Sequence, residues 1–220
     1  MTGWPVAPIF FDNLPYLLKA AGMTCLIALA VIPLAALWGG TLALASVFGG
    51  RYLRWAVQTY VYVLRGIPLL ILLFVMYYAL PFTGIDLPPL PGGIVVISLY
   101  YAAFMSEVFR AALLSLPRSQ WDAGRCLGMH SSLLLRIVVL PQTLRVAAPP
   151  FVNICMMIVK GTSLISVIGI WELTLAGREV VERTFAPFQI LGGVALIYFC
   201  ICFTLATIAR RLEAQRRYVH

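Results

Sequence analysis

Charged residues are scarce in this chain of 220 residues: they make up 11% of it, against about 25% in a typical soluble domain. Hydrophobic residues make up 62%. A soluble fold of this length still exposes roughly a quarter to a third of its unfolded-chain surface, so it cannot hide that much apolar surface. The composition therefore excludes a soluble enzyme, a secreted scaffold and a disordered tail. It predicts an all-α integral membrane protein with one transmembrane domain over residues 1–220.

Groups that bind haem or metals, or that form disulfides, are also few. Only His130 and His220 are present, which is too few for bis-histidine haem ligation within a helix bundle. None of the five cysteines forms a CxxC pair and most lie in apolar runs, so we expect buried free thiols. No catalytic residue, metal site or cofactor is expected on this chain.

Acidic residues are outnumbered: 16 Lys and Arg stand against 8 Asp and Glu, a formal net charge of +8. In a soluble protein this excess would suggest nucleic-acid binding. Here the basic residues cluster between apolar runs, and no basic helix or aromatic platform accompanies them. A membrane explains their distribution, and no nucleic-acid partner is expected.

Long apolar runs dominate the chain, and a span needs about 20 mostly apolar residues. Residues 20–50 and 184–209 contain no charge at all. Hydropathy predicts five spans, with a helix break over residues 65–68 in the second and charged or proline-rich loops at 81–93 and 171–187. The spans are expected at about 17–46, 56–80, 93–114, 146–168 and 188–209.

Five spans place the termini on opposite sides of the membrane, and the basic residues indicate which side is cytoplasmic. One side carries Lys19, Arg178 and Arg183. The other side carries eleven arginines, at positions 51, 54, 110, 118, 125, 136, 145, 210, 211, 216 and 217. We therefore expect the N-terminus outside, and the C-terminus and the polar insert 116–145 inside.

Helix start and stop signals fall within this insert. Ser119 and Asp122 have the spacing of a helix-start capping pair, in which the hydroxyl accepts a backbone N–H and the carboxylate suits the first turn. Gly128 suits the C-terminus of the resulting short helix. Ser131 is expected to cap a second short helix, which Pro141 stops.

Small residues on the first short helix let another protein approach it closely. Ala123 and Leu127 are four residues apart and share a face, as do Gly124 and Gly128. One interpretation is a docking helix for a partner subunit. The other is a loop that packs only on its own bundle.

The insert resembles the EAA motif of ABC importer permeases, which reads Glu-Ala-Ala, three residues, Gly, nine residues, Ile, one residue, Leu-Pro. The spacing agrees at every position, and the substitutions are Asp for Glu, Gly for the second Ala and Val for Ile. The matching residues are Asp122-Ala123-Gly124, Gly128, Val138 and Leu140-Pro141.

Flanking segments resemble the polar amino acid branch of these permeases, the histidine, glutamine and arginine type. With the motif, they extend the resemblance over about residues 17–210. These segments are 65–70, 106–110, 116–117, 120–121, 140–142, 160–164 and 172–173.

The resemblance implies a permease subunit of an ATP-driven importer for polar amino acids, in the inner membrane of a bacterium. Such a subunit forms half the translocation pathway. Two permease chains, alike or different, would pair with two ABC ATPase subunits and an extracytoplasmic solute-binding protein. The ATPase-coupling residues would then be Ser119, Asp122, Ala123, Gly124, Leu127, Gly128 and His130.

This division of labour also implies that the chain is not an enzyme, and that ATP and Mg bind the partner ATPase. The sequence agrees, because it contains no Gly-x-x-x-x-Gly-Lys-Ser/Thr loop to hold a nucleotide phosphate.

Charges inside apolar spans are costly, at about 2.5–3.5 kcal/mol by insertion scales, so each is a candidate functional residue. Lys160 lies deep in span four; it either binds a substrate carboxylate or pairs with Glu107 or another acidic group. Gly161 loosens the helix beside Thr162 and Ser163, which makes this stretch the best candidate for the pathway. In the alternative, both hydroxyls bond back to their own helix. In the family that the chain resembles, many members carry an acidic or amide residue in place of Gly161, so the resemblance does not imply a cation-binding role for this chain.

Other polar residues also have two readings. Glu107 and Arg110 are spaced to pair with each other at the end of span three, and the alternative role for them is gating of the pathway. Arg65, ten residues into span two, anchors the helix break or contacts substrate. His130 is either solvated or contacts the ATPase.

Two other functions stay open. An autonomous secondary transporter or channel subunit would work without an ATPase and would not require the EAA spacing. A structural membrane subunit without a pathway would tolerate neutral replacements of Lys160, Thr162 and Ser163.

Overall fold

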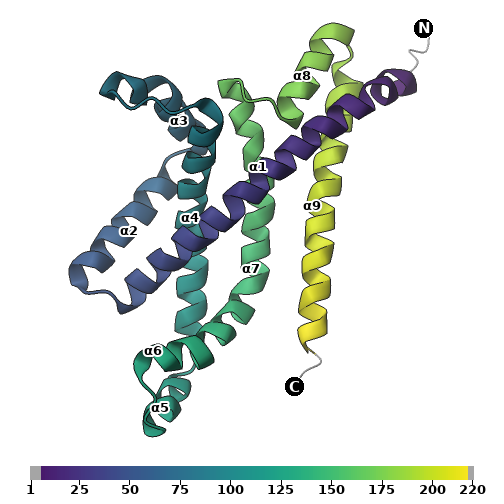
Figure 1. The fold of residues 1–220 in the computed structure, drawn as a ribbon. Helices are drawn as coiled ribbons and strands as arrows, with labels where there is room; N and C mark the ends of the chain where they lie inside the picture. The colour runs from purple at the N-terminus through teal and green to yellow at the C-terminus, as the bar shows by residue number, and fades with distance from the viewer. Residues whose placement is uncertain (1–5, 218–220) are drawn as a thin grey trace.

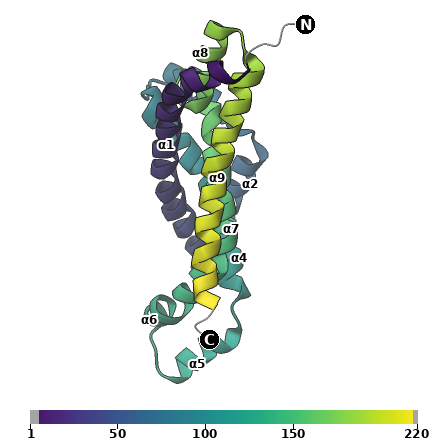
Figure 2. The same ribbon diagram turned by 90° about the vertical axis from the view of Figure 1, so that its right-hand side faces the viewer.

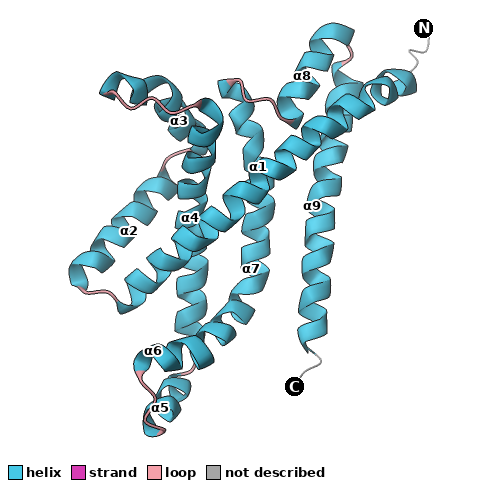
Figure 3. Cartoon of the chain, viewed as in Figure 1, coloured by secondary structure: helices cyan, strands magenta, loops and turns pink. Residues whose placement is uncertain are grey.

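The computed structural model describes residues 6–217, and this part of the chain is built from helices joined by short loops, without a strand (Figure 3). The π-helical turns are η1 and η3, and the 3-10 segments are η2 and η4. In chain order the elements are α1 (Val6–Phe48), α2 (Arg51–Gly66), α3 (Leu69–Phe74), η1 (Val75–Ala79), η2 (Leu80–Thr83), α4 (Pro89–Ser115), α5 (Arg118–Cys126), α6 (Ser131–Leu134), η3 (Leu135–Val139), α7 (Leu140–Gly161), η4 (Thr162–Ile168), α8 (Leu173–Thr184) and α9 (Pro187–Arg217).

Five spans are present if one of them is broken. Four helical segments are long and apolar enough to cross a membrane, namely Ile9–Phe48, Pro89–Ser115, Ser131–Ile168 and Pro187–Ala209. The fifth consists of α2 and the segment Leu69–Thr83, which are bent by 99° relative to each other. The predicted all-α, five-span fold is thus confirmed.

The break in the second span follows from proline geometry. Ile67 is extended (φ −103°, ψ 132°), because the ring of the following proline disfavours the helical region for the residue before it. Pro68 then precedes the first residue of α3, where the missing N–H removes no intrahelical bond. The expected break over residues 65–68 therefore lies at Ile67 and Pro68.

Helix α1 runs obliquely across the bundle and contacts α4, α7, α8 and α9 (Figures 1 and 2). At its close approach to α4, a Cβ on Gly39 would lie 2.8 Å from the Met105 Cβ and 2.9 Å from the Ala102 carbonyl oxygen. Helices α5 and α6 lie at one end of the bundle and α8 lies at the opposite end (Figures 1 and 2). We call these the α5 end and the α8 end.

Two apolar clusters follow one another along α1. The central cluster joins the middle of α1 to α3, α4, α7 and η4, around fully buried residues such as Val31, Leu73 and Ile158. The α8 cluster joins the beginning of α1 to α8 and α9. Its buried members are Leu17, Ala20, Ala21, Leu173, Ala176, Val180, Ile190, Val194 and Ile197.

The segment 171–187 was expected to be a charged loop, and that expectation is wrong. Most of it forms α8, because Leu173, Ala176 and Val180 recur at helical spacing and bury one face against α1 and α9. The helix ends at Phe185, whose backbone is left-handed (φ 50°).

The expectation of buried thiols is also wrong for most of the cysteines. Cys155 is buried and Cys202 is partly buried, whereas Cys25, Cys126 and Cys200 are exposed. Cys25, Cys200 and Cys202 lie in spans whose apolar side chains face outward as well as inward. Position in an apolar run therefore does not imply burial within a membrane protein.

Helix boundaries in the 116–145 insert differ from expectation. Pro117 occupies the N-cap position of α5, so Ser119 lies inside the first turn and does not cap it. His130, rather than Ser131, caps α6, because its side chain accepts a hydrogen bond from the Ser132 N–H. The first expectation rests on the Ser119–Asp122 spacing, and the second rests on the capping propensity of serine.

Pro141 does not stop the second helix of the insert. The π-helical turn η3 (Leu135–Val139) precedes it, and α7 continues from Leu140 to Gly161. A proline lacks an N–H and crowds the carbonyl four residues before it. A wider helical turn directly before Pro141 accommodates both effects.

Candidate functional site

The turn that ends α5 has a specific hydrogen-bond pattern. Gly128 has a left-handed backbone (φ 72°), and its N–H donates to the Arg125 carbonyl oxygen at 2.9 Å. The Met129 N–H donates to the Gly124 carbonyl oxygen at 3.0 Å, which completes a Schellman motif. The expectation that Gly128 ends this helix is confirmed.

The two glycines of the motif serve different purposes. Gly124 is buried against α6, where a Cβ would collide with the side chain of Leu134. A Cβ on Gly128 would meet nothing within 4 Å, so that position needs glycine for its backbone conformation alone. Gly124 therefore packs within the chain, and it does not share an open face with Gly128.

Apolar contacts hold one side of α5 to the bundle. The ring centroid of Trp121 lies 5.8 Å from that of Phe48 at the end of α1. Leu113 of α4 and Leu134 of α6 are buried in the same small cluster, against which Trp121 packs. Helix α5 is thus fixed where α1, α4 and α6 meet.

The other side of α5 is exposed. Leu127 is 80% exposed, and Asp122 and Ala123 are exposed beside it. Asp122 lies 3.8 Å from Arg125 in a surface pair, which contributes little to stability. Leu127 and these polar neighbours lie beyond the ends of the spans and are accessible to another protein. Of the candidate coupling residues, Gly124 is buried and the exposed ones are Ser119, Asp122, Ala123, Leu127, Gly128 and His130.

Lys160 lies on an exposed side of α7. Asn153 and Met157 are exposed on the same side, whereas Cys155 and Ile158 are buried on the opposite side. Among residues 9–209, for which side chains are described, Lys160 forms no salt bridge. The structural pairing of Lys160 with Glu107 is therefore not observed.

The helix changes form at the predicted pathway stretch. Helix α7 ends at Gly161 and continues as the 3-10 segment η4, which begins at Thr162. Gly161 is also a contact point with α4, because a Cβ there would collide with the hydroxyl of Tyr101. That hydroxyl donates to the Met157 carbonyl oxygen at 2.9 Å.

The hydroxyls of this stretch bond back to their own helix. Thr162, which is fully buried, donates to the Val159 carbonyl oxygen at 2.8 Å. Ser163 donates to the Lys160 carbonyl oxygen at 2.7 Å. Both hydroxyls therefore stabilise the tightened turn in this state, rather than pointing unbonded toward a solute.

Arg65, Glu107 and Arg110 gather beside one side of α4. The Arg65 guanidinium carbon lies 5.2 Å from the ring centroid of Phe104, one turn before Glu107. Glu107 accepts hydrogen bonds from Arg110 Nε at 3.0 Å and Nη2 at 2.8 Å, so the predicted pairing is observed. Two guanidinium groups and one carboxylate leave this group with a net positive charge.

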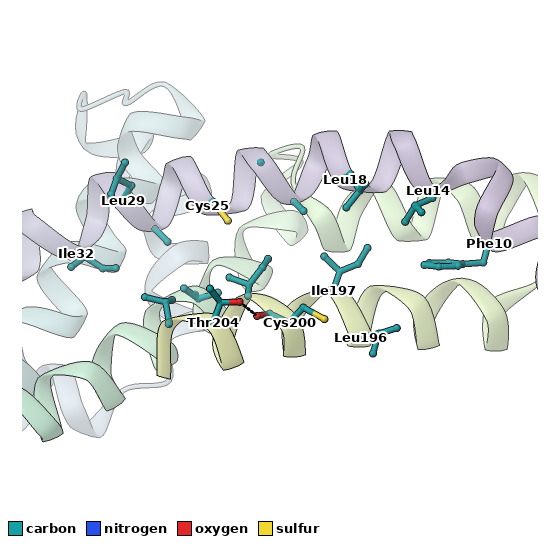
Figure 4. A pocket seen from close by; sticks show the side chains of 16 residues that line it. Phe10, Leu14, Leu18, Cys25, Leu29, Ile32, Leu196, Ile197, Cys200 and Thr204 are labelled. Atoms are coloured by element: carbon teal, nitrogen blue, oxygen red, sulfur yellow. Dashed lines mark hydrogen bonds between the residues drawn. The ribbon is translucent and has the colours of Figure 1, made fainter. Parts of the chain in front are cut away.

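A cavity of about 680 Å³ lies between α1 and α9 (Figure 4). Its lining is almost entirely apolar, and Leu14 and Leu18 of α1 face Ile197 of α9. The Thr204 hydroxyl in the lining already donates to the Cys200 carbonyl oxygen at 2.8 Å. No predicted site residue lines this cavity, and its apolar walls do not suit a charged amino acid.

Glu172 is a buried polar residue outside the predicted site, within the segment that charge and hydropathy predict to be a loop. It is 0% exposed, and its carboxylate caps α8 by accepting from the N–H groups of Thr174 and Leu175. Burial raises the pKa of Glu172 above that of an ordinary glutamate, while hydrogen bonds from Tyr198 and from the first turn of α8 act in the opposite direction. An acidic residue directly before the helical apolar pattern of α8 was the available sequence signal.

Residues 32–217 match the family described as binding-protein-dependent transport system inner membrane component. The chain is 32% identical over 216 residues to the glutamine transport system permease protein GlnP of Escherichia coli K12, covering 97% of this chain and 95% of that protein. It is 39% identical over 180 residues to the L-cystine transport system permease protein TcyB of Bacillus subtilis, covering 80% of this chain and 76% of that protein.

Solved structures share the fold. An amino acid ABC transporter crystallised with histidines matches with a TM-score of 0.88 at 25% identity, covering 98% of this chain and 100% of that chain. The methionine ABC transporter MetNI, in an inward-facing conformation, matches with a TM-score of 0.69 at 19% identity, covering 93% and 98% of the two chains.

Proposed function

The chain belongs to the family of binding-protein-dependent transport system inner membrane components, and from this premise we propose that it is the membrane-spanning subunit of an ATP-driven importer for polar amino acids. It is a multi-pass protein of a bacterial inner membrane, and as a permease subunit it is not itself an enzyme. Relatives named for glutamine and L-cystine transport support the polar amino acid class.

The proposed orientation places the N-terminus outside and the C-terminus inside. Its support is the distribution of basic residues over the two ends of the bundle. Arg118 and Arg125 belong to α5 and Arg136 follows α6 at the α5 end, whereas α8 carries Arg178 and Arg183 beside the acidic Glu179 and Glu182. The positive-inside rule then makes the α5 end cytoplasmic.

The observation that carries the proposal is the two-sidedness of α5. One side packs on the bundle through Trp121 and Gly124, and the other side presents Leu127 with Asp122 and Ala123. This exposed side would dock on a cytoplasmic ATPase subunit, which would bind ATP and Mg²⁺. The remaining candidate coupling residues, Ser119, Gly128 and His130, flank this side.

The proposed pathway lies along the side of the bundle on which Lys160 is exposed and Ser163 is partly exposed. Gly161 and the buried Thr162 shape the backbone there, and Arg65 with Glu107 forms the second polar group. A second permease chain would supply the other half. The complete importer would contain two ATPase subunits, with a solute-binding protein at the α8 end.

Purification of the tagged chain in mild detergent from its native membrane tests the proposal. We expect an ATPase with Walker motifs to co-purify, along with one or two kinds of permease chain. Reproducible absence of an ATPase from the intact, folded protein would favour an autonomous transporter instead.

A matched pair of variants tests the docking side. Leu127→Asp should reduce the amount of ATPase that co-purifies, because it places a charge in the proposed contact. Leu87→Asp, at a 36% exposed leucine outside the docking helix, is the control and should retain the ATPase. Equal retention by both variants would contradict docking through α5.

A further inference from the structure

The central cluster and the α8 cluster meet at a boundary marked by Thr24, Glu172 and Tyr198, which we call the seam. Ile165 and Ile168 of η4 pack in the central cluster, whereas Leu173, at the start of α8, packs in the α8 cluster. The short connection between them contains Gly169, which is left-handed (φ 79°), and Glu172. The seam therefore falls where the proposed pathway segment η4 passes into α8.

Helices α1 and α9 cross the same seam. Along α1, Ala21 belongs to the α8 cluster and Ile27 to the central cluster, and the buried Thr24 lies between them. On α9, Tyr198 packs against both clusters. Each of the three crossings thus carries a polar side chain, namely Thr24, Glu172 or Tyr198.

The Glu172 carboxylate joins these crossings. One of its oxygens accepts from the N–H groups of Thr174 at 2.8 Å and Leu175 at 3.1 Å. The other oxygen accepts from the hydroxyls of Tyr198 at 2.7 Å and Thr24 at 3.2 Å. One half of the carboxylate therefore caps α8, and the other half holds α1 and α9.

Both hydroxyls also contact the first turn of α8. Thr24 Oγ1 accepts from the Leu173 N–H at 3.1 Å, and the Tyr198 hydroxyl lies 3.0 Å from Thr174 Oγ1. Each side chain from α1 or α9 thus makes two bonds within the seam. The network fixes the position of α8 in a way that apolar contacts alone do not.

No cation contacts the Glu172 carboxyl group. Among residues 9–209 it forms no salt bridge, and its side chain is 0% exposed. Its polar partners are four hydrogen-bond donors at the N-terminal end of α8. A simple helix cap requires only the two backbone bonds, so the two hydroxyl bonds call for a separate explanation.

We propose that Glu172 is a positioning residue for transport: it fastens α8 to α1 and α9, and so fixes the far end of the pathway segment η4. This inference rests on the proposed importer function. Segment η4 is attached to α7 at Gly161 and to the seam at Glu172. When α7 moves, η4 then changes its position relative to α8, because Glu172 keeps α8 in place on α1 and α9.

The test uses the complete importer in proteoliposomes with its solute-binding protein. Glu172→Gln keeps an acceptor oxygen for the α8 N–H groups, but its amide nitrogen cannot accept from the hydroxyls. Tyr198→Phe removes one of those hydroxyls and preserves the ring. We expect about ten-fold slower transport per complex for Glu172→Gln and about five-fold for Tyr198→Phe. The KM for the loaded binding protein should be unchanged, and more ATP should be hydrolysed per solute.

Tyr16→Phe is the matched control. Tyr16 of α1 also bonds to α8, through Glu179, and it accepts from Trp171 Nε1 at 3.0 Å, but it lies outside the seam. This variant should keep the wild-type ratio of ATP to solute. The ratio separates positioning from general loosening of α8, which would affect Tyr16→Phe and Tyr198→Phe alike.

Two results would overturn the proposal. One is a wild-type transport rate and ATP-to-solute ratio in both seam variants, which would make Glu172 a helix cap only. The other is an equal change in the Tyr16→Phe control. Failure of the importer function itself is a different outcome, because no ATPase would then assemble with the wild-type chain.

Discussion

The α5 end and the α8 end are fastened to the bundle by different forces. Helix α5 packs through apolar contacts around Trp121 and Leu134, and its opposite side stays open. Helix α8 adds to its apolar cluster a buried network in which Glu172 bonds to two other helices. Helix α5 therefore keeps an exposed side that a partner can contact, whereas the polar groups at the start of α8 bond to other residues of the same chain.

A helix at the end of a bundle can bind a partner or stabilise the fold, and the two kinds of packing suit these two roles differently. Apolar packing is non-directional, so it tolerates small displacements when a partner pulls on the helix. A satisfied buried hydrogen-bond network is directional and favours one position. We therefore expect substitutions at the α8 end to act on stability, and those on the open side of α5 to act on partner binding.

The largest effect is expected from Glu172→Ala, which removes the acceptor from four donors, of which the Thr24 hydroxyl is buried and the other three are partly buried. Each unsatisfied buried donor costs about 1–3 kcal/mol, although water filling the space would recover part of it. The midpoint of thermal unfolding of the detergent-solubilised protein should fall by many degrees. Glu182→Ala, at an exposed position on α8, is the control. Equal midpoints for the two variants would remove the distinction between the ends.

Gly124→Leu should break the attachment of α5. Its side chain must occupy space held by Leu134, and such overpacking costs about 1–3 kcal/mol. We expect most of the co-purifying ATPase to be lost while the spans remain in the membrane. Gly192→Leu, where a Cβ meets nothing within 4 Å, should behave as wild type. Retention of the ATPase by Gly124→Leu would show that this packing does not position α5.

A smaller effect is expected at Gly128, where the backbone rather than space is limiting. Gly128→Ala should destabilise the α5 turn by about 1 kcal/mol, because alanine is strained at positive φ. Gly128→Asn should cost less, since asparagine adopts this conformation more readily. Hydrogen exchange of the Met129 amide can rank the two variants. A larger loss of protection in the asparagine variant would exclude backbone strain as the reason for glycine.

The smallest effect on folding is expected from Asp122→Asn. The carboxylate lies in an exposed pair with Arg125, at 3.8 Å, and such pairs contribute about 0–1 kcal/mol. The unfolding midpoint should therefore be unchanged within error. A drop comparable to that of Glu172→Ala would mean that the two ends do not differ as described.

Local patterns in the sequence predict much of this fold. Apolar runs locate the spans, the residues around Pro68 locate the break, and Gly128 locates the end of α5. Each of these features depends on residues within one continuous stretch of the chain. The EAA spacing also placed α5 itself correctly, because a short motif is read without tertiary information.

The remaining features depend on contacts between distant parts of the chain. Glu172 bonds to Thr24, 148 residues away, and to Tyr198, 26 residues away. Charge and hydropathy carry no information on such distant partners, and they predict a solvated loop for this segment. The spacing of Gly124 and Gly128 predicts a shared open face, but in the fold the side chain of Leu134 covers Gly124. Capping by His130 instead of Ser131 likewise depended on how the chain leaves the turn at Gly128.

The cavity between α1 and α9 also provides a native reporter position. Cys25 and Cys200 lie among its lining residues, one on each helix, and both are exposed (Figure 4). After replacement of Cys126 and Cys202, the other accessible thiols, nitroxide labels at this pair would measure the separation of α1 and α9 without any introduced cysteine. Pulsed electron spin resonance on such a sample could follow that separation through a cycle of ATP binding and hydrolysis.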